Sequence, residues 1–288
     1  MTEPKPAKHY AVWLTSLAPF VLPSTLEFEF SDAKVYVRNL LTPLPNSESP
    51  EHLGLHYLAI IQQPDVRASF AHAVNAASVV NDLLAAVHSV DLPDPRPTYA
   101  IDLDSRNSAR EFGQFVDSLP LTRFLRRHFR EPAFRAFFDR WGPLPPSPLK
   151  NRLLRAFALH RRSISETDLL DMFEDLWGAL EALNLSLQER HSLPKTYPGK
   201  PCPNCGAATE VPGSSAGIRH AVIALANFSV ADWNTIRQLR VDIVHGLVDH
   251  AQLAPRLPAA IPILRKALIC AVADLLEIKG QSVQDLQW

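Results

Sequence analysis

The chain has 288 residues, 47% of them hydrophobic, and a formal net charge of −1 at pH 7. This length and composition allow a sizeable core in one or two domains, and the near-neutral charge argues against a general polyanion binder. The sequence contains no glycine-rich phosphate loop, GxSxG elbow or HExxH helix, so the common nucleotide-cofactor and hydrolase classes are disfavoured.

The first ninety residues predict strands followed by a helix. Four segments have the composition of strands: HYAVWL from His9, LEFEF from Leu26, KVYV from Lys34 and LHYLAII from Leu55. Over residues 66–90 the apolar side chains instead recur at the three- and four-residue spacing of a helix.

A proline-rich segment, GPLPPSP at 142–148, is the expected domain boundary, because consecutive prolines break helices and form stiff spacers. The sequence from Ser165 to Asp168 is typical of a helix N-cap. We therefore expect an α+β protein, with a mixed α+β domain over 1–142 and an all-α helical domain over 148–288. Helical patterns in the second domain cover 147–162, 166–190, 216–228, 231–246 and 258–277.

The segment 121–162 is strongly basic, because ten arginines and Lys150 stand against Glu131 and Asp139. Its net charge is +9, so the remainder of the chain carries −10. Arginines interleaved with aromatic residues can bind phosphates and stack on bases, but amphipathic helices with solvated arginine faces produce the same pattern. The aromatic residues in question are Phe124, Phe129, Phe134, Phe137, Phe138, Trp141 and Phe157.

The segment IRQLRVDIVHG, Ile236 to Gly246, places a cation on a helix that otherwise has apolar stripes. A guanidinium seldom occupies such a position without a partner, so Arg240 is a candidate functional residue. His245 lies five residues later, and its side chain meets Arg240 only through the reach of the arginine, an unwound helix end or a partner subunit. Gly246 is the expected unwinding point, because glycine is favoured just after a helix C-terminus.

Two segments resemble the HEPN superfamily, all-helical domains that include many metal-independent ribonucleases. IRQLRVDIVHG is similar to the Arg-x4-His motif of these proteins, and in particular to the ending of the ApeA-like branch. FEDLWGALEALN, Phe173 to Asn184, is similar to the Trp-x-x-Leu-Glu-x-Leu first helix of that branch. One departure is Val241, because catalytic members usually have a small polar residue directly after the arginine.

The resemblance implies a homodimer that cleaves RNA without a cofactor, as an effector of stress response or antiviral defence. In such an enzyme His245 is the acid/base, Arg240 stabilises charge on the phosphate, and Glu181 orients one of them. Two alternatives remain open. Arg240 and His245 could instead form a structural ion pair that ties two helices together, for example with Glu181 or Asp242. The helical domain could instead be a non-catalytic interaction or nucleotide- or RNA-binding module, as for HEPN proteins encoded beside methylamine-utilisation genes; Val241 favours this.

Cys202 and Cys205 have the CxxC spacing and following glycine of a zinc knuckle, so the sequence predicts a possible structural zinc site there. His191 and His220 flank this segment as further candidate ligands, and a metal-free turn or the remnant of a lost site is the alternative. The sequence has three cysteines, no secretory signal pattern and no long uninterrupted apolar run, so we expect a cytoplasmic protein that does not cross a membrane.

Overall fold

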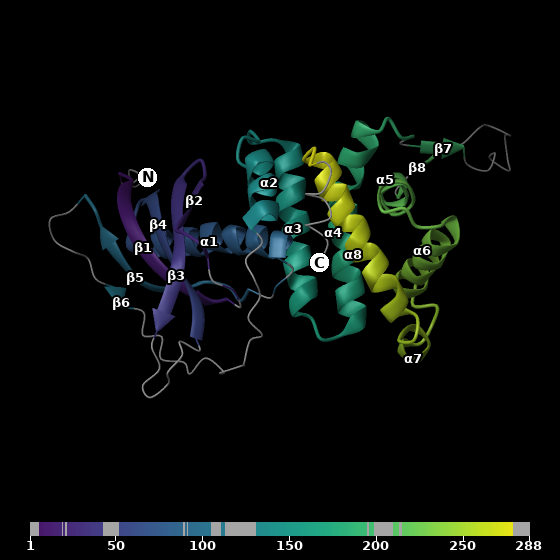
Figure 1. Ribbon diagram of the computed structural model, residues 1–288, viewed down its shortest axis with the longest axis horizontal. Coiled ribbons are helices and arrows are strands. Elements are labelled where there is room, and N and C mark those ends of the chain that lie inside the picture. The colour runs from purple at the N-terminus through teal and green to yellow at the C-terminus, as the bar shows by residue number, and fades with distance from the viewer. Residues whose placement is uncertain are drawn as a thin grey trace, which may run out of the picture. The chain divides into compact units, whose positions relative to one another are not determined.

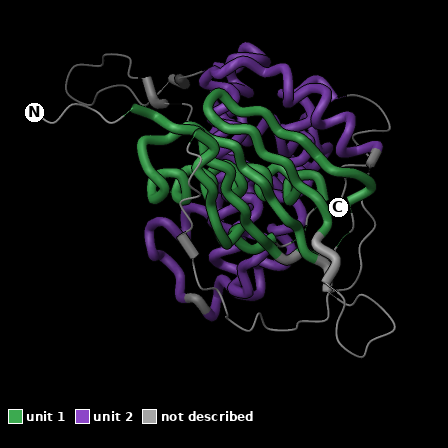
Figure 2. The backbone as a smooth tube through the Cα atoms, turned by 90° about the vertical axis from the view of Figure 1, so that its left-hand side faces the viewer, with its two compact units in different colours: residues 1–131 green, residues 132–288 purple. Residues whose placement is uncertain are grey.

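The chain folds into two compact units, Met1–Glu131 and Pro132–Trp288 (Figure 2). The first contains an antiparallel sheet and the second consists mainly of helices, so the predicted α+β class is confirmed. The computed structural model describes residues 6–18, 20, 22–42, 52–88, 90, 92–104, 111–112, 131–194, 196–198, 210–212 and 215–278.

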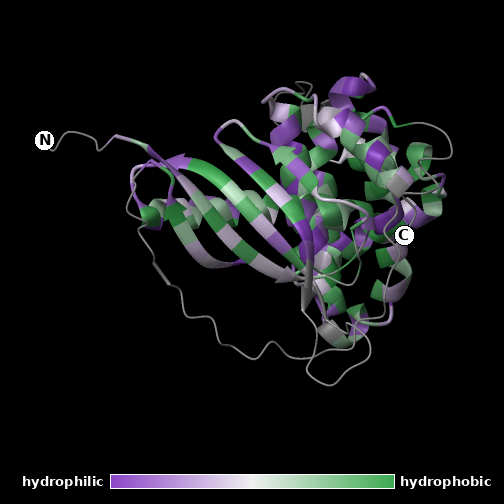
Figure 3. Cartoon of the chain, turned by 60° about the vertical axis from the view of Figure 1, so that its left-hand side comes forward, coloured by the Kyte–Doolittle hydropathy of each residue, from purple (hydrophilic) through white to green (hydrophobic). Residues whose placement is uncertain are grey.

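Unit 1 is built on a six-stranded antiparallel sheet with the order β2-β3-β4-β1-β5-β6. The four predicted strand segments lie in β1 to β4, along which buried and more exposed side chains alternate over most positions. This alternation places every second side chain on the buried face. Figure 3 shows hydrophilic and hydrophobic residues interspersed along the strands of the sheet. The strands are β1 (Lys8–Leu17), β2 (Leu26–Glu29), β3 (Ala33–Thr42), β4 (His52–Gln63), β5 (Arg96–Asp102) and β6 (Glu111–Phe112).

Helix α1 (Val66–His88) covers one face of this sheet and forms the core with it. The Tyr57 hydroxyl on β4 donates a hydrogen bond to Asn81 Oδ1 on α1, so even the polar tip of this buried ring has a partner. Among the described residues α1 is the one helix long and apolar enough to cross a membrane, by length and composition alone. Most of its residues are buried against other parts of the protein, as in a core helix.

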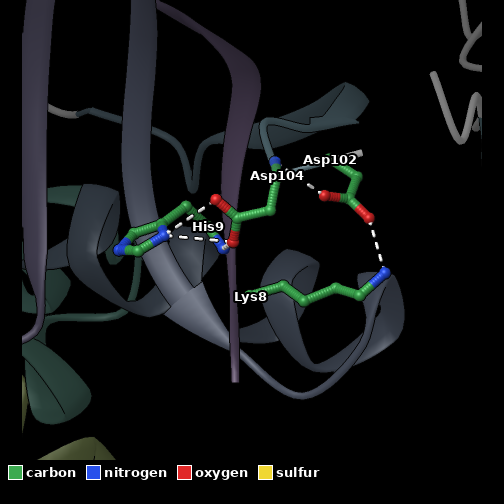
Figure 4. Close-up of polar contacts among 4 residues, drawn as sticks. All are labelled: Lys8, His9, Asp102 and Asp104. Atoms are coloured by element: carbon green, nitrogen blue, oxygen red, sulfur yellow. Dashed lines mark hydrogen bonds and ion pairs between the residues drawn. The ribbon is translucent and has the colours of Figure 1, made fainter. Parts of the chain in front are cut away.

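Ion pairs fix the register where β1 begins and β5 ends (Figure 4). Lys8 Nζ lies 2.8 Å from Asp102 Oδ2, and the His9 backbone N–H donates to Asp104 Oδ2 at 2.7 Å. Asp102 Oδ1 in turn accepts the Asp104 backbone N–H at 3.0 Å. The bond from the His9 backbone lowers the pKa of the Asp104 carboxyl, which keeps this partner charged.

The five predicted helices of the C-terminal region are all present, with ends displaced by a few residues. Asp168 is the N-cap of the second of them, since its carboxylate accepts the Leu170 N–H at 2.6 Å. The predicted helix at 216–228 is interrupted by a π-turn. The elements are α2 (Glu131–Trp141), α3 (Pro148–Ser165), α4 (Leu169–Arg190), β7 (Thr196–Pro198), β8 (Glu210–Pro212), α5 (Ala216–His220), η1 (Ala221–Leu225), α6 (Val230–Val244), α7 (His250–Leu253) and α8 (Leu257–Leu275).

The division between the units falls after the first residue of α2, whereas the predicted boundary lies after this helix, at 142–148. Aromatic packing explains the difference. The Phe157 ring on α3 contacts Phe137 and Trp141 of α2 edge-on, each with a centroid distance of 5.5 Å. These three rings are buried, so in the described part of the basic segment they form core and do not present faces for base stacking.

Helix α4 is central to unit 2 and packs against α3, α5 and α8 (Figure 1). The close approach of α5 requires a glycine, because a Cβ on Gly217 would lie 2.4 Å from the Asn184 backbone oxygen. Asn184 also accepts the Gly217 N–H with its Oδ1 at 2.8 Å, so the two helices are joined at this point.

Candidate functional site

Capping residues at both ends determine where α6 begins and ends. Ser229 and Asp232 form a reciprocal capping box at its start. At its end the Leu247 N–H donates to Asp242 O and the Gly246 N–H to Ile243 O, with Gly246 at φ +59°. This is the Schellman arrangement, so Gly246 ends the helix as predicted and leaves His245 as the C-cap.

Arg240 lies on α6 and borders an open groove of about 490 Å³ formed with α3 and α4. One of its terminal guanidinium nitrogens lies 3.3 Å from Glu174 Oε1 on α4, and the Arg240 side chain is 26% exposed. The groove is lined by Arg155, Leu159, Arg162, Glu166, Asp171, Glu174, Asp175, Gly178 and Arg240. Arg240 therefore has both a protein partner and access to solvent.

The groove has a mixed charge, since three arginines face four carboxylates. The Arg162 guanidinium is held by both oxygens of Asp175, with Nε to Oδ2 at 2.7 Å, and this hydrogen bonding raises the pKa of Arg162. Arg155 is exposed, and among the described residues it has no acidic partner within ion-pair distance. Arg155 and Arg240 are thus the cations in this groove best able to bind an incoming anion.

His245 is exposed and is not part of the groove lining. Within the described residues, no hydrogen bond or ring contact joins it to Arg240. One chain therefore leaves the two predicted catalytic side chains accessible but does not bring them into contact. Next to His245, Val244 and Leu247 are 54% and 64% exposed, so the end of α6 presents apolar surface to solvent.

Glu181 supports the helix packing at some distance from Arg240. Its Oε1 accepts the indole N–H of Trp177 at 2.6 Å, and Trp177 stacks on Trp233 of α6 with centroids 6.1 Å apart. Glu181 thereby fixes the ring that joins α4 to α6. Its predicted role in orienting a catalytic group remains a prediction.

Asp242 is buried and accepts hydrogen bonds from Arg256 at 2.7 Å and Gln238 at 2.8 Å, which lower its pKa. The alternative of a structural ion pair is present for Arg240, which joins α6 to α4, but its partner is Glu174 and neither of the example partners Glu181 and Asp242. Glu174 was missed although its signal is present in the sequence. Asp171, Glu174, Asp175 and Gly178 recur at three- and four-residue spacing and share one face of α4.

The predicted zinc ligands Cys202 and Cys205 lie outside the described residues. The flanking histidines do come together, with the His191 and His220 ring centroids 4.1 Å apart. His191 Nε2 lies 2.8 Å from Asp274 Oδ2, within hydrogen-bonding distance. Within the part of the chain that the structure describes, no group of three or more His, Cys, Asp or Glu side chains is arranged to hold a metal.

Comparison with known proteins identifies no relative of this chain. No family model, curated protein or solved structure matches the chain.

Proposed function

We propose that this protein is a HEPN-like, metal-independent endoribonuclease whose site is completed by a second copy of the chain. The observation that carries the proposal is the accessibility of Arg240 and His245 on one short stretch of α6. Arg240 borders the open groove, and His245 is exposed at the C-cap five residues later. The similarity of both helices to HEPN segments adds the reaction class.

The two side chains suit transesterification of RNA. The ribose 2′-OH attacks the adjacent phosphorus, the bond to the 5′-oxygen breaks, and the products have a cyclic phosphate and a 5′-hydroxyl. His245 transfers the proton, because an imidazole exchanges protons near neutral pH. Arg240 stabilises the charge that develops on the non-bridging oxygens, as a guanidinium held in place by Glu174 is well able to do.

A partner subunit explains how the two groups meet. Neither the reach of Arg240 nor the glycine at the end of α6 brings them into contact within the described residues of one chain. The exposed Val244 and Leu247 beside His245 supply apolar surface that a second copy would cover. In such a homodimer each chain contributes an arginine and a histidine to a composite groove.

The test is incubation of the purified protein with labelled RNA and with an oligonucleotide of the same sequence that lacks every 2′-OH. We expect cleavage of the first only, with 2′,3′-cyclic phosphate ends, and a loss of at least about a hundredfold in Arg240→Ala and in His245→Ala. Arg237→Ala is the matched control, because it removes an exposed arginine from the same helix. Cleavage that persists in both variants would assign the activity to another site or to a contaminant.

A second candidate function is a non-catalytic interaction module. It is favoured by two ion pairs, Arg240 with Glu174 and Arg162 with Asp175, because they leave these two arginines less able to bind RNA. It is also favoured by Val241, which stands where catalytic HEPN proteins usually have a small polar residue. If the protein is such a module, its dimer should bind the partner equally well when Arg240 and His245 are both replaced. The wild type should then cleave no RNA.

A further inference from the structure

The sheet of unit 1 has a second face that α1 does not cover. Tyr57 points to α1, as its hydrogen bond to Asn81 shows, so the strand residues that alternate with it lie on the opposite side. Leu58 follows Tyr57 on β4 and is paired in register with Trp13 of β1 and Tyr36 of β3. Among the described residues of unit 1, α1 is the only helix, and this opposite face remains partly exposed.

One row of side chains on this open face is aromatic and apolar. Tyr36, Leu58, Trp13 and Tyr99 lie side by side across β3, β4, β1 and β5. The Trp13 and Tyr99 rings are stacked, with centroids 4.4 Å apart and planes 13° apart, and Tyr99 is 37% exposed. A contiguous row of partly exposed apolar side chains is the kind of surface that binds a partner.

The neighbouring row is polar and cationic. Arg38, His56, Thr15 and Arg96 follow one another across the same four strands. The Arg38 Nε–H donates to His56 Nδ1 at 3.4 Å, so the histidine accepts and the guanidinium is aimed along the row. Burial and the Arg38 charge both lower the pKa of His56, which keeps this ring neutral near pH 7.

Parts of both rows line a depression of about 380 Å³. Its lining is Trp13, Thr25, Tyr36, Arg38, His56 and Leu58. Leu58 lies between Trp13 and Tyr36 in the row, so the space above it is flanked by two aromatic side chains. Their strands are two spacings apart, roughly 10 Å, which is enough for one planar base between two rings.

We propose that this face binds single-stranded nucleic acid, with one base stacked over Leu58 between Trp13 and Tyr36 and the backbone phosphates on Arg38 and Arg96. Stacking on aromatic rings beside a cationic track is how proteins hold single strands without reading their sequence. At the β2 edge the carboxylate of Glu27 pairs with Lys34, so it does not oppose the phosphates as a free charge.

An oligonucleotide fits this face better than a free nucleotide does, although the two share the same base and phosphate chemistry. The depression is open, and the cationic row extends across four strands, roughly 14 Å, which exceeds the reach of a single phosphate. The proposal does not rest on Arg240 or His245, and it stands or falls separately from the nuclease function.

The experiment measures binding of a fluorescent single strand of about 12 nucleotides to the full chain by anisotropy. DNA avoids any cleavage, and RNA is measured in the His245→Ala variant. We expect Trp13→Ala to weaken binding about five- to a hundredfold and Arg38→Ala to weaken it with a smaller salt dependence. Arg67→Ala is the matched control, because this exposed arginine lies on α1, on the other side of the sheet.

Photocrosslinking of a 5-iodouracil strand to the wild-type chain keeps the test independent of variant folding. The proposal is supported by a crosslink to Trp13 or Tyr36 that excess unlabelled strand abolishes. The same concentration of AMP should leave this crosslink in place. Competition by AMP as effective as that by the strand would assign the face to free nucleotides instead. Equal loss of binding in Arg38→Ala and Arg67→Ala, or crosslinks elsewhere only, would overturn it.

Discussion

The Arg240–Glu174 ion pair is the contact on which the proposed chemistry depends most closely. Glu174 positions the guanidinium, yet its carboxylate also competes with an RNA phosphate for the same donors. Both side chains are partly exposed, so their attraction is modest, at most about 1 kcal/mol.

Glu174→Gln should therefore tighten RNA binding by no more than about fivefold, because a neutral amide competes less with phosphate than a carboxylate does. The affinity is measured in the His245→Ala background to prevent cleavage. The exposed Glu189, which pairs with Arg152 outside the groove, provides Glu189→Gln as the control. Weaker RNA binding in Glu174→Gln alone would show that positioning of Arg240 outweighs the competition of the carboxylate with phosphate, and would contradict this prediction.

His160 makes the stability of unit 2 sensitive to pH. Complete burial, with a smaller contribution from the Arg265 charge, lowers its pKa to about 3. The unfolded chain therefore binds a proton that the folded chain does not, at pH values between about 3 and 6.5. The stabilisation from the neutral ring is fully present above pH 6.5 and is lost as the pH falls below it.

We expect the free energy of unfolding to fall more steeply in the wild type than in His160→Phe as the pH is lowered from 6.5 to 4.5. The difference between the two slopes should be about 1.4 kcal/mol per pH unit. Urea unfolding at a series of pH values measures both slopes. His72→Phe, on α1 with a partly exposed ring, is the comparison variant. Parallel slopes for wild type and His160→Phe would show that His160 is protonated in the folded protein.

At the level of the elements, the sequence was most informative where a local signal determines the structure. The strand patterns of β1 to β4, a cap within Ser165–Asp168 and the Gly246 termination each depend on neighbouring residues only, and each was predicted. The N-cap itself is Asp168, because Ser165 belongs to the end of α3. β5 was not predicted, because Pro97 and the prolines just before it disfavour a strand. The groove around Arg240 could not be predicted, because it exists only where α3, α4 and α6 meet.

Substituting two helical glycines separates the effect of tertiary packing on stability from that of helix propensity. Gly217→Ala should destabilise the protein by about 1–3 kcal/mol, because the new Cβ would meet the rigid backbone of Asn184 at 2.4 Å. Gly178→Ala should be neutral or stabilising by up to about 1 kcal/mol, because its Cβ would lie 3.4 Å from a flexible leucine methyl and alanine is the better helix former. Thermal unfolding of both variants tests the pair, and equal effects would contradict the role given to Gly217.

At the scale of the whole molecule, the two proposals assign contact with nucleic acid to both units through unrelated residues. Trp13→Ala should then raise KM for a long RNA with little change in kcat, whereas His245→Ala should lower kcat. Steady-state cleavage of a long and a very short RNA measures this, with the Trp13 effect confined to the long substrate. A fall in kcat in Trp13→Ala with KM unchanged would mean that the sheet does not act by binding substrate.

The measurement that tests the account most directly is activity after mixing two inactive variants. Arg240 and His245 do not touch within the described residues of one chain, so a catalytic site that contains both needs two chains. Arg240→Ala and His245→Ala, each inactive alone, should regain part of the wild-type RNA cleavage when unfolded together and refolded as mixed dimers. Native mass spectrometry verifies that mixed dimers form. If they form and remain inactive, a composite site made of one arginine and one histidine from different chains is contradicted.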